Sequence, residues 1–133
     1  MNREIINTTA APSPIGPYNQ AIKAGNLLFV SGQIAIDPSS GNLITDSIAA
    51  ETQQVMKNIT AILKEAGAGF NNIVKTTIFL SDMSLFAEVN EIYGGYFTAE
   101  HGESQPVFPA RETVAVKGLP KNVNVEISVI AAL

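Results

Sequence analysis

The sequence predicts an α+β fold in which a mixed β-sheet carries two helices on one face. Two observations predict it: the order of the elements along the chain and the alternation of apolar residues within the strands. Strand–helix–strand connections imply parallel pairing, whereas strands that follow one another directly imply a hairpin. The chain has 133 residues without an internal repeat or a linker-like stretch, so we expect a single domain over residues 1–133.

The first half of the chain predicts a turn, a strand and a long helix. Residues 10–17 are rich in Pro, Gly and Ser, and residues 26–36 form an apolar, β-prone run that ends at the turn sequence DPSSG. In residues 46–66 the apolar side chains are spaced alternately by four and three, which indicates a helix with one core-facing side. We expect Asp46 to cap this helix and Gly67 to end it.

The second half predicts a strand at 73–81, a helix over about 84–98 and two closing strands, at 113–117 and 123–131, which should form a hairpin. In the last strand, valine and isoleucine alternate with Asn124, Glu126 and Ser128, so one face of the sheet should lie under the helices. The opposite face is too apolar for water and too polar for a second helix layer. A symmetric oligomer that covers it is therefore expected.

Composition and charge argue against several function classes. The chain has no cysteine, which removes disulfides, thiolate nucleophiles and zinc–thiolate sites. The formal net charge is −4 and no Lys/Arg cluster is present, which argues against nucleic-acid binding. The N-terminus lacks a signal-peptide pattern and no apolar run approaches membrane-spanning length, so we expect a soluble, cytoplasmic protein that does not bind membranes.

Few residues could carry chemistry. The one histidine, His101, lies in a polar loop and is expected to be a surface residue; no metal-site spacing is present. Arg111 and Glu126 interrupt otherwise apolar strands, which fits a salt bridge or an edge-strand charge as well as a functional pair. Tyr18 follows a Gly-Pro turn, and Ser31-Gly32 interrupts a strand where glycine permits a close approach of the backbone.

Five stretches of the chain form a wider pattern: APSPIGPYNQA at 11–21, FVSGQIAIDPSSG at 29–41, VKTTIFLSDMSLFAEVNEIYGGYF at 74–97, PAR at 109–111 and VEI at 125–127. In this order and nearly without gaps, they resemble the RidA (YjgF) family of enamine/imine deaminases from about Ile5 to Ala131. The resemblance implies a chorismate-mutase-like fold, a homotrimer with active sites in clefts between subunits, and no cofactor.

The resemblance also implies the site. The family's functional residues fall on Arg111, Glu126, Tyr18, Ser31 and Asn90, with Gly32 and Thr113 where backbone groups line the cleft. The implied reaction hydrolyses reactive 2-imino acids, such as 2-iminobutyrate and 2-iminopropionate, to 2-oxo acids and ammonia. Arg111 would grip the substrate carboxylate with its guanidinium fork, and Glu126 would orient or deprotonate the attacking water. The other residues would position substrate and water.

Two features depart from the family pattern. Glu112 stands where the family usually has a small or apolar residue; strand alternation points it away from Arg111, yet it could compete for the guanidinium or repel anionic substrates. The loop at 99–108 is several residues longer than usual and could reshape the cleft entrance. Thr113 stands where some members have cysteine, which argues that no thiol is required.

Three other functions stay open. A non-catalytic regulatory protein on the same trimer would use Arg111 to anchor a small carboxylate. A nuclease or translation-affecting role, reported for some relatives, is opposed by the acidic charge. A pathway-specific deaminase, acting for example on an aminomuconate-like substrate, would use the long loop to set its specificity.

Overall fold

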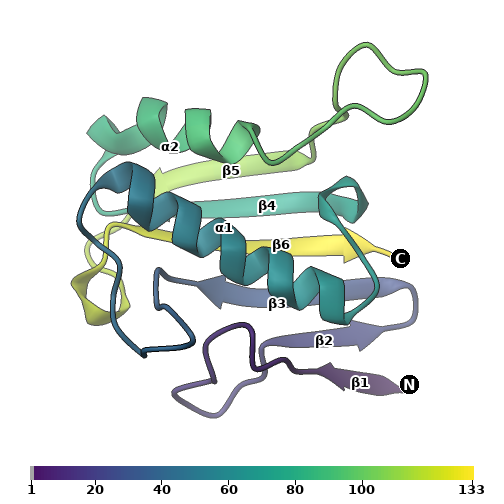
Figure 1. Cartoon of the computed structure of the whole chain (residues 1–133), viewed down its shortest axis with the longest axis horizontal. Coiled ribbons are helices and arrows are strands. Elements are labelled where there is room, and N and C mark those ends of the chain that lie inside the picture. The colour runs from purple at the N-terminus through teal and green to yellow at the C-terminus, as the bar shows by residue number, and fades with distance from the viewer. Residues whose placement is uncertain (1) are drawn as a thin grey trace.

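The computed structural model describes residues 2–133, and within them six strands form one sheet with two helices on one of its faces (Figure 1). The predicted α+β class is confirmed. The strands are β1 (Arg3–Ile6), β2 (Ala21–Ala24), β3 (Leu27–Gln33), β4 (Ile73–Leu80), β5 (Ala110–Ala115) and β6 (Val125–Ala132), and the helices are α1 (Ile48–Glu65) and α2 (Phe86–Gly94).

The strand order in the sheet is β1-β2-β3-β6-β4-β5. β4 precedes α2 in the chain and β5 follows it, and the two strands run parallel, as the strand–helix–strand order predicted. The other neighbouring strands run antiparallel. The predicted hairpin of the two closing strands is wrong, because β6 pairs with β3 and β4 and not with β5. In its central position, β6 buries its apolar side under the helices. At the edge of the sheet beside β5, this apolar side would be left in water.

The long helix α1 begins one residue later than predicted. Ser47, and not Asp46, is its N-cap: the Ser47 hydroxyl accepts a hydrogen bond from the Ala50 backbone N–H at 3.0 Å. The spacing of three residues is the one at which a cap side chain reaches an unpaired N–H of the first turn. Gly67 follows the helix with a φ of +75°, so it ends α1 as expected.

The second helix is shorter than predicted. A 3-10 turn at Met83–Leu85 precedes α2, and the helix stops at Gly94, followed directly by Gly95. Two adjacent glycines weaken a helix because they lose the most backbone freedom when they are ordered. Phe97, which the prediction had placed in the helix, still packs in the core from the loop that follows.

The strand β5 begins at Ala110, three residues before the predicted start, because it pairs with β4 from Lys75 onward. Tertiary pairing here overrides the weak β-propensity of the Arg-Glu dipeptide that opens the strand. Arg111 therefore lies within the strand, one residue from its start.

The two faces of the sheet differ as the alternation in β6 predicted. The face under the helices contains the buried residues Val125, Ile127, Val129 and Ala131. The opposite face carries large apolar side chains that stay in contact with solvent in a single chain, among them Ile5, Leu27, Phe29 and Val114 at 36–61% exposure. Such a surface is typical of one that another protein chain covers.

Neither helix within residues 2–133 combines the length and the apolar character that crossing a membrane requires.

Candidate functional site

The predicted site residues lie on opposite faces of the sheet. Arg111 is the register partner of Thr76, which is fully buried under the helices. Glu126 is the register partner of Phe79 and lies between the buried residues Val125 and Ile127, so its side chain is on the open face. Partners in register share a face. One chain therefore does not bring Arg111 and Glu126 together, and the salt bridge that the sequence left open between them is not formed.

The Arg111 guanidinium lies at the wall of an apolar cavity of about 320 Å³. Asn90, Tyr93, Gly94, Phe108 and Pro109 complete the cavity lining. Within residues 2–133, no carboxylate lies within ion-pair distance of Arg111. An arginine presents five N–H donors in a planar fork that matches a carboxylate. The cavity therefore offers a cation to an external anion.

Two aromatic rings of α2, which the sequence analysis did not single out, flank this arginine. The guanidinium carbon lies 5.7 Å from the ring centroid of Phe86 and 5.3 Å from that of Tyr93. Both distances are within the range of a cation–π interaction. The spacing i, i+4, i+7 of Phe86, Asn90 and Tyr93 is the signal that could have placed them beside one another on α2.

Thr113 lies two residues beyond Arg111, on the same face of β5, where its register partner is the buried Ile78. Its hydroxyl oxygen is buried and has no hydrogen-bond partner in the part of the chain that the structure describes. Buried polar groups normally have a partner, so this hydroxyl is available to a further hydrogen-bond partner.

Glu126 faces Gly32 on the open side of the sheet. Gly32 lies where the pairing of β3 with β6 shifts register between Val30 and Gln33. A Cβ atom added to Gly32 would lie 2.8 Å from Glu126 Oε2 and 2.9 Å from its Cδ. Only glycine therefore leaves room for the carboxylate where it lies. This close approach explains the Ser31-Gly32 interruption of the strand.

The pKa of Glu126 is raised above its ordinary value because the carboxylate is partly buried. It lines a small cavity of about 60 Å³ together with Gly32, Tyr18 and neighbouring apolar residues. Desolvation favours the neutral acid, so this carboxylate holds a proton more readily than an exposed one. A carboxylate that holds a proton more readily in this way is suited to exchange a proton with water.

Tyr18 and Ser31 border the same region. The Tyr18 backbone N–H donates a hydrogen bond to the Gly16 carbonyl at 2.9 Å, and the Ile15 N–H donates to the Tyr18 hydroxyl at 3.3 Å. The Ser31 hydroxyl donates to the Asn19 carbonyl at 2.6 Å. These contacts fix the turn that carries the phenol, as the Gly-Pro turn in the sequence indicated.

A residue that the sequence analysis did not single out holds this turn in place. Gln20 is buried, and its side-chain amide bonds the backbone of Thr8, Ala11 and Pro12 at 2.7–3.2 Å. The backbone groups of this irregular segment have no partners in a helix or sheet, and the Gln20 amide supplies hydrogen bonds to several of them. A glutamine directly before an apolar strand is only a weak signal of this role.

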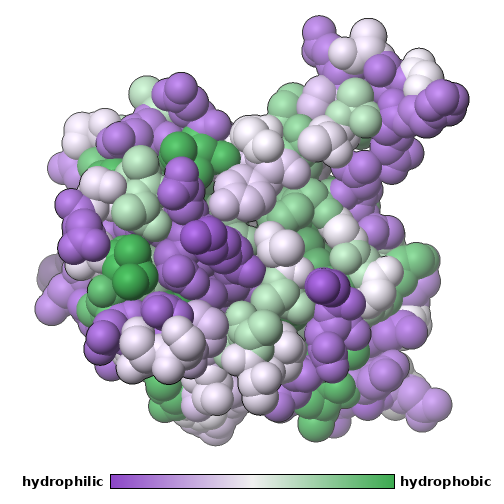
Figure 2. Space-filling view, viewed as in Figure 1, coloured by the Kyte–Doolittle hydropathy of each residue, from purple (hydrophilic) through white to green (hydrophobic). Residues whose placement is uncertain are grey.

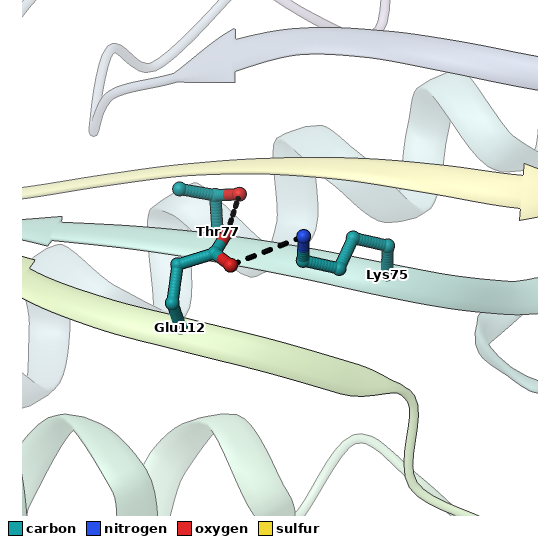
Figure 3. Close-up of polar contacts among 3 residues, drawn as sticks. All are labelled: Lys75, Thr77 and Glu112. Atoms are coloured by element: carbon teal, nitrogen blue, oxygen red, sulfur yellow. Dashed lines mark hydrogen bonds and ion pairs between the residues drawn. The ribbon is translucent and has the colours of Figure 1, made fainter.

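Glu112 lies on the open face and Arg111 on the other, as alternation predicted. Figure 3 shows Glu112 with its polar partners Lys75 and Thr77. One of its carboxylate oxygens lies 3.0 Å from Lys75 Nζ, and the other accepts a hydrogen bond from the Thr77 hydroxyl at 2.6 Å. The Thr77 hydrogen bond and then the contact with Lys75 lower the pKa of Glu112. Glu112 therefore does not compete for the guanidinium within its own chain.

The long loop between α2 and β5 projects away from the body of the protein (Figure 1), and most of its tip is hydrophilic (Figure 2). His101 is exposed there, as expected for a surface residue. The loop returns through Val107, which is 72% exposed, to Phe108, which lines the Arg111 cavity and lies 5.6 Å from the Phe97 ring. The loop thus leads directly into one wall of that cavity.

Comparisons with known proteins agree with this architecture. The family model described as "Endoribonuclease L-PSP" matches residues 8–133. A RutC family protein of Pyrococcus abyssi is 50% identical over 131 residues, which are 98% of each chain. The 2-iminobutanoate/2-iminopropanoate deaminase of Mus musculus is 46% identical over 129 residues, which are 97% of this chain and 90% of the mouse protein.

Solved structures are similar over almost the whole chain. The Rid family protein YyfA of Yersinia pestis superposes with a TM-score of 0.91 at 47% identity, covering 99% of this chain and 100% of that one. TdcF of E. coli, solved with bound serine, has a TM-score of 0.88 at 36% identity and covers 98% of each chain. These relatives differ in what their names state, since one names a deaminase activity and others only a family. The chain belongs to the Rid (YjgF/RutC) family.

Proposed function

We propose that this protein is a deaminase that hydrolyses 2-imino acids, such as 2-iminobutyrate and 2-iminopropionate, to 2-oxo acids and ammonia. The observation that carries the proposal is the Arg111 guanidinium, which has no acidic partner within residues 2–133 and borders a cavity of about 320 Å³. A 2-imino acid has a planar carboxylate next to its reactive carbon. A guanidinium fork binds such a group in a fixed orientation.

The active site is formed between two subunits of a homotrimer. This part of the proposal is supported by the placement of Arg111 and Glu126 on opposite faces of one sheet. It is also supported by the exposed apolar residues of the open face, which a second copy would cover. Arg111, Asn90 and Thr113 then come from one subunit, and Glu126, Tyr18, Ser31 and Gly32 come from its neighbour.

The protons balance without a further reactant. Water attacks the carbon of the protonated imine while Glu126 accepts a proton from that water, which gives a tetrahedral carbinolamine. Glu126 returns the proton to the nitrogen, and the C–N bond breaks as the hydroxyl becomes the carbonyl of the 2-oxo acid. The hydroxyl proton leaves with ammonia as ammonium. The raised pKa of Glu126 suits it to hold the proton between the two steps.

The test generates 2-iminobutyrate in place with a threonine dehydratase and follows 2-oxobutyrate while semicarbazide traps free imine. We expect the wild-type protein to accelerate 2-oxobutyrate release and Arg111→Ala to lose about a hundredfold or more in kcat/KM, since the carboxylate loses its only charged partner. Light scattering on both proteins controls for assembly. No acceleration by an intact wild-type assembly would contradict the deaminase proposal.

A regulatory protein that binds a small carboxylate without turning it over is the second candidate. Arg111, which has no acidic partner among residues 2–133, favours it as well, and the relative TdcF was solved with bound serine. Titration with 2-oxobutyrate separates the two functions. Binding that requires Arg111, without any acceleration of imine hydrolysis, would favour regulation. The acidic net charge of −4 still opposes the RNA cleavage that the family description names.

A further inference from the structure

One side of α2 faces Arg111: Asn90 and Tyr93 line the cavity, and the Phe86 ring lies against the guanidinium. Phe86, Asn90 and Tyr93 are spaced i, i+4 and i+7, so they lie along one stripe of the helix. The guanidinium carbon of Arg111 lies over both aromatic rings of this stripe, 5.7 Å from the Phe86 centroid and 5.3 Å from the Tyr93 centroid. The guanidinium is thus flanked by rings and has no carboxylate within ion-pair distance among residues 2–133.

The Tyr93 ring is held firmly. Tyr93 is 5% exposed, and its hydroxyl donates a hydrogen bond at 2.8 Å to the hydroxyl of Thr76, which is fully buried. The Phe97 ring lies 5.0 Å from the Tyr93 ring. Thr76 is also the register partner of Arg111 in the pairing of β4 with β5. Thr76 therefore contacts both the strand that carries Arg111 and the Tyr93 ring beside the guanidinium.

A free arginine side chain has many rotamers, and a ligand that binds it must bear the loss of this freedom. Rings that contact the guanidinium before the ligand arrives reduce this loss and leave the N–H groups available. We propose that Phe86 and Tyr93 are positioning residues that hold the Arg111 guanidinium ready for the substrate carboxylate. This inference rests on the proposed function, since it deepens the role of the same site.

The two rings differ in how strongly they should act. Tyr93 is buried and hydrogen-bonded, whereas Phe86 is 36% exposed at the start of α2. A cation–π contact is stronger where it is desolvated. Removal of the Tyr93 ring should therefore weaken carboxylate binding more than removal of the Phe86 ring.

The experiment measures the dissociation constant of 2-oxobutyrate by NMR titration of the assembled protein. We expect Tyr93→Leu to weaken binding roughly tenfold and Phe86→Leu about threefold. Tyr93→Phe keeps the ring and loses only the hydrogen bond to Thr76, so it should weaken binding much less than Tyr93→Leu. Tyr96→Leu is the matched control, because Tyr96 stacks on Phe70 just after α2 and does not contact Arg111. In turnover, the loss should appear in KM with kcat largely retained.

The outcomes separate this inference from the proposed function. If Arg111→Ala abolishes 2-oxobutyrate binding but Tyr93→Leu and Phe86→Leu bind normally, the positioning role is overturned and the carboxylate site stands. Equal losses in Tyr93→Phe and Tyr93→Leu would also overturn it, since the ring is kept in only one of them. If Arg111→Ala binds normally, the carboxylate site itself fails. Should Tyr93→Leu not fold, Phe86→Leu decides the question, because Phe86 is 36% exposed and its loss disturbs the core less.

Discussion

The Arg111 region and the Glu126 region differ in the charged group that each contains and in the surroundings of that group. Arg111 keeps a permanent charge, lies among aromatic rings and has no acidic partner within residues 2–133. Glu126 is a carboxylate whose pKa is raised by burial and which fits its place only because Gly32 has no side chain. The first region is suited to hold an anion, and the second is suited to exchange a proton. Each supplies what the other lacks, and the sheet separates them.

Mixing two inactive variants in one trimer tests whether the Arg111 and Glu126 regions of neighbouring subunits form one site. Arg111→Ala and Glu126→Gln homo-oligomers should each be nearly inactive, because every site lacks one half. Co-expressed with different tags and purified through both, so that only mixed trimers remain, the mixture should recover about a third of the wild-type activity, because one site in three joins an intact Arg111 to an intact Glu126. A mixture as inactive as its parents would show that the two halves do not meet between subunits.

Gly32→Ala tests the room that the Glu126 region needs. The added methyl group would lie 2.8 Å from Glu126 Oε2, so the flexible end of the glutamate must move. We expect about a hundredfold loss of deaminase activity, as for a displacement of about 1 Å at a reacting group, with little change in the thermal midpoint. Binding of 2-oxobutyrate at Arg111 should be kept. Wild-type activity in Gly32→Ala would mean that the position of this carboxylate does not matter.

The smallest expected effect is a pH dependence of stability that differs between two carboxylates of the open face. Glu126 has a raised pKa, so the folded state binds more protons, and its ionisation costs stability as pH rises from the unfolded pKa to the folded one. Glu126→Gln should therefore raise the thermal midpoint by roughly one or two degrees above this window and lose the gain below it.

Glu112→Gln is the matched control with the opposite sign. The pKa of Glu112 is lowered, chiefly by the Thr77 hydroxyl, so its ionised form contributes stability above the unfolded pKa that is lost as pH falls through the folded pKa. Glu112→Gln should lower the midpoint at neutral pH, and the difference should vanish in acid. Thermal scans of both variants across pH check the pair; shifts of the same sign would contradict the assignment.

Much of the architecture was predictable because it depends on local patterns. The four-and-three spacing in residues 46–66 predicted the start of α1 to within one residue, and the alternation in residues 123–131 placed Glu126 on the opposite side from Val125. The hairpin prediction failed because strand order is not a local property. Nothing in residues 113–131 indicates that β6 pairs with β3 and β4 at the centre of the sheet.

The sequence alone named Tyr18, Ser31, Asn90, Arg111 and Glu126 as candidates, because the motifs around them can be read without coordinates. It also determined that Glu112 points away from Arg111, since adjacent residues of a strand face opposite sides. Only the tertiary structure decided that Arg111 and Glu126 lie on different faces of the sheet. Alternation gives the relative faces within one strand, whereas the faces of two strands are linked only by their register, which a shift of one residue inverts.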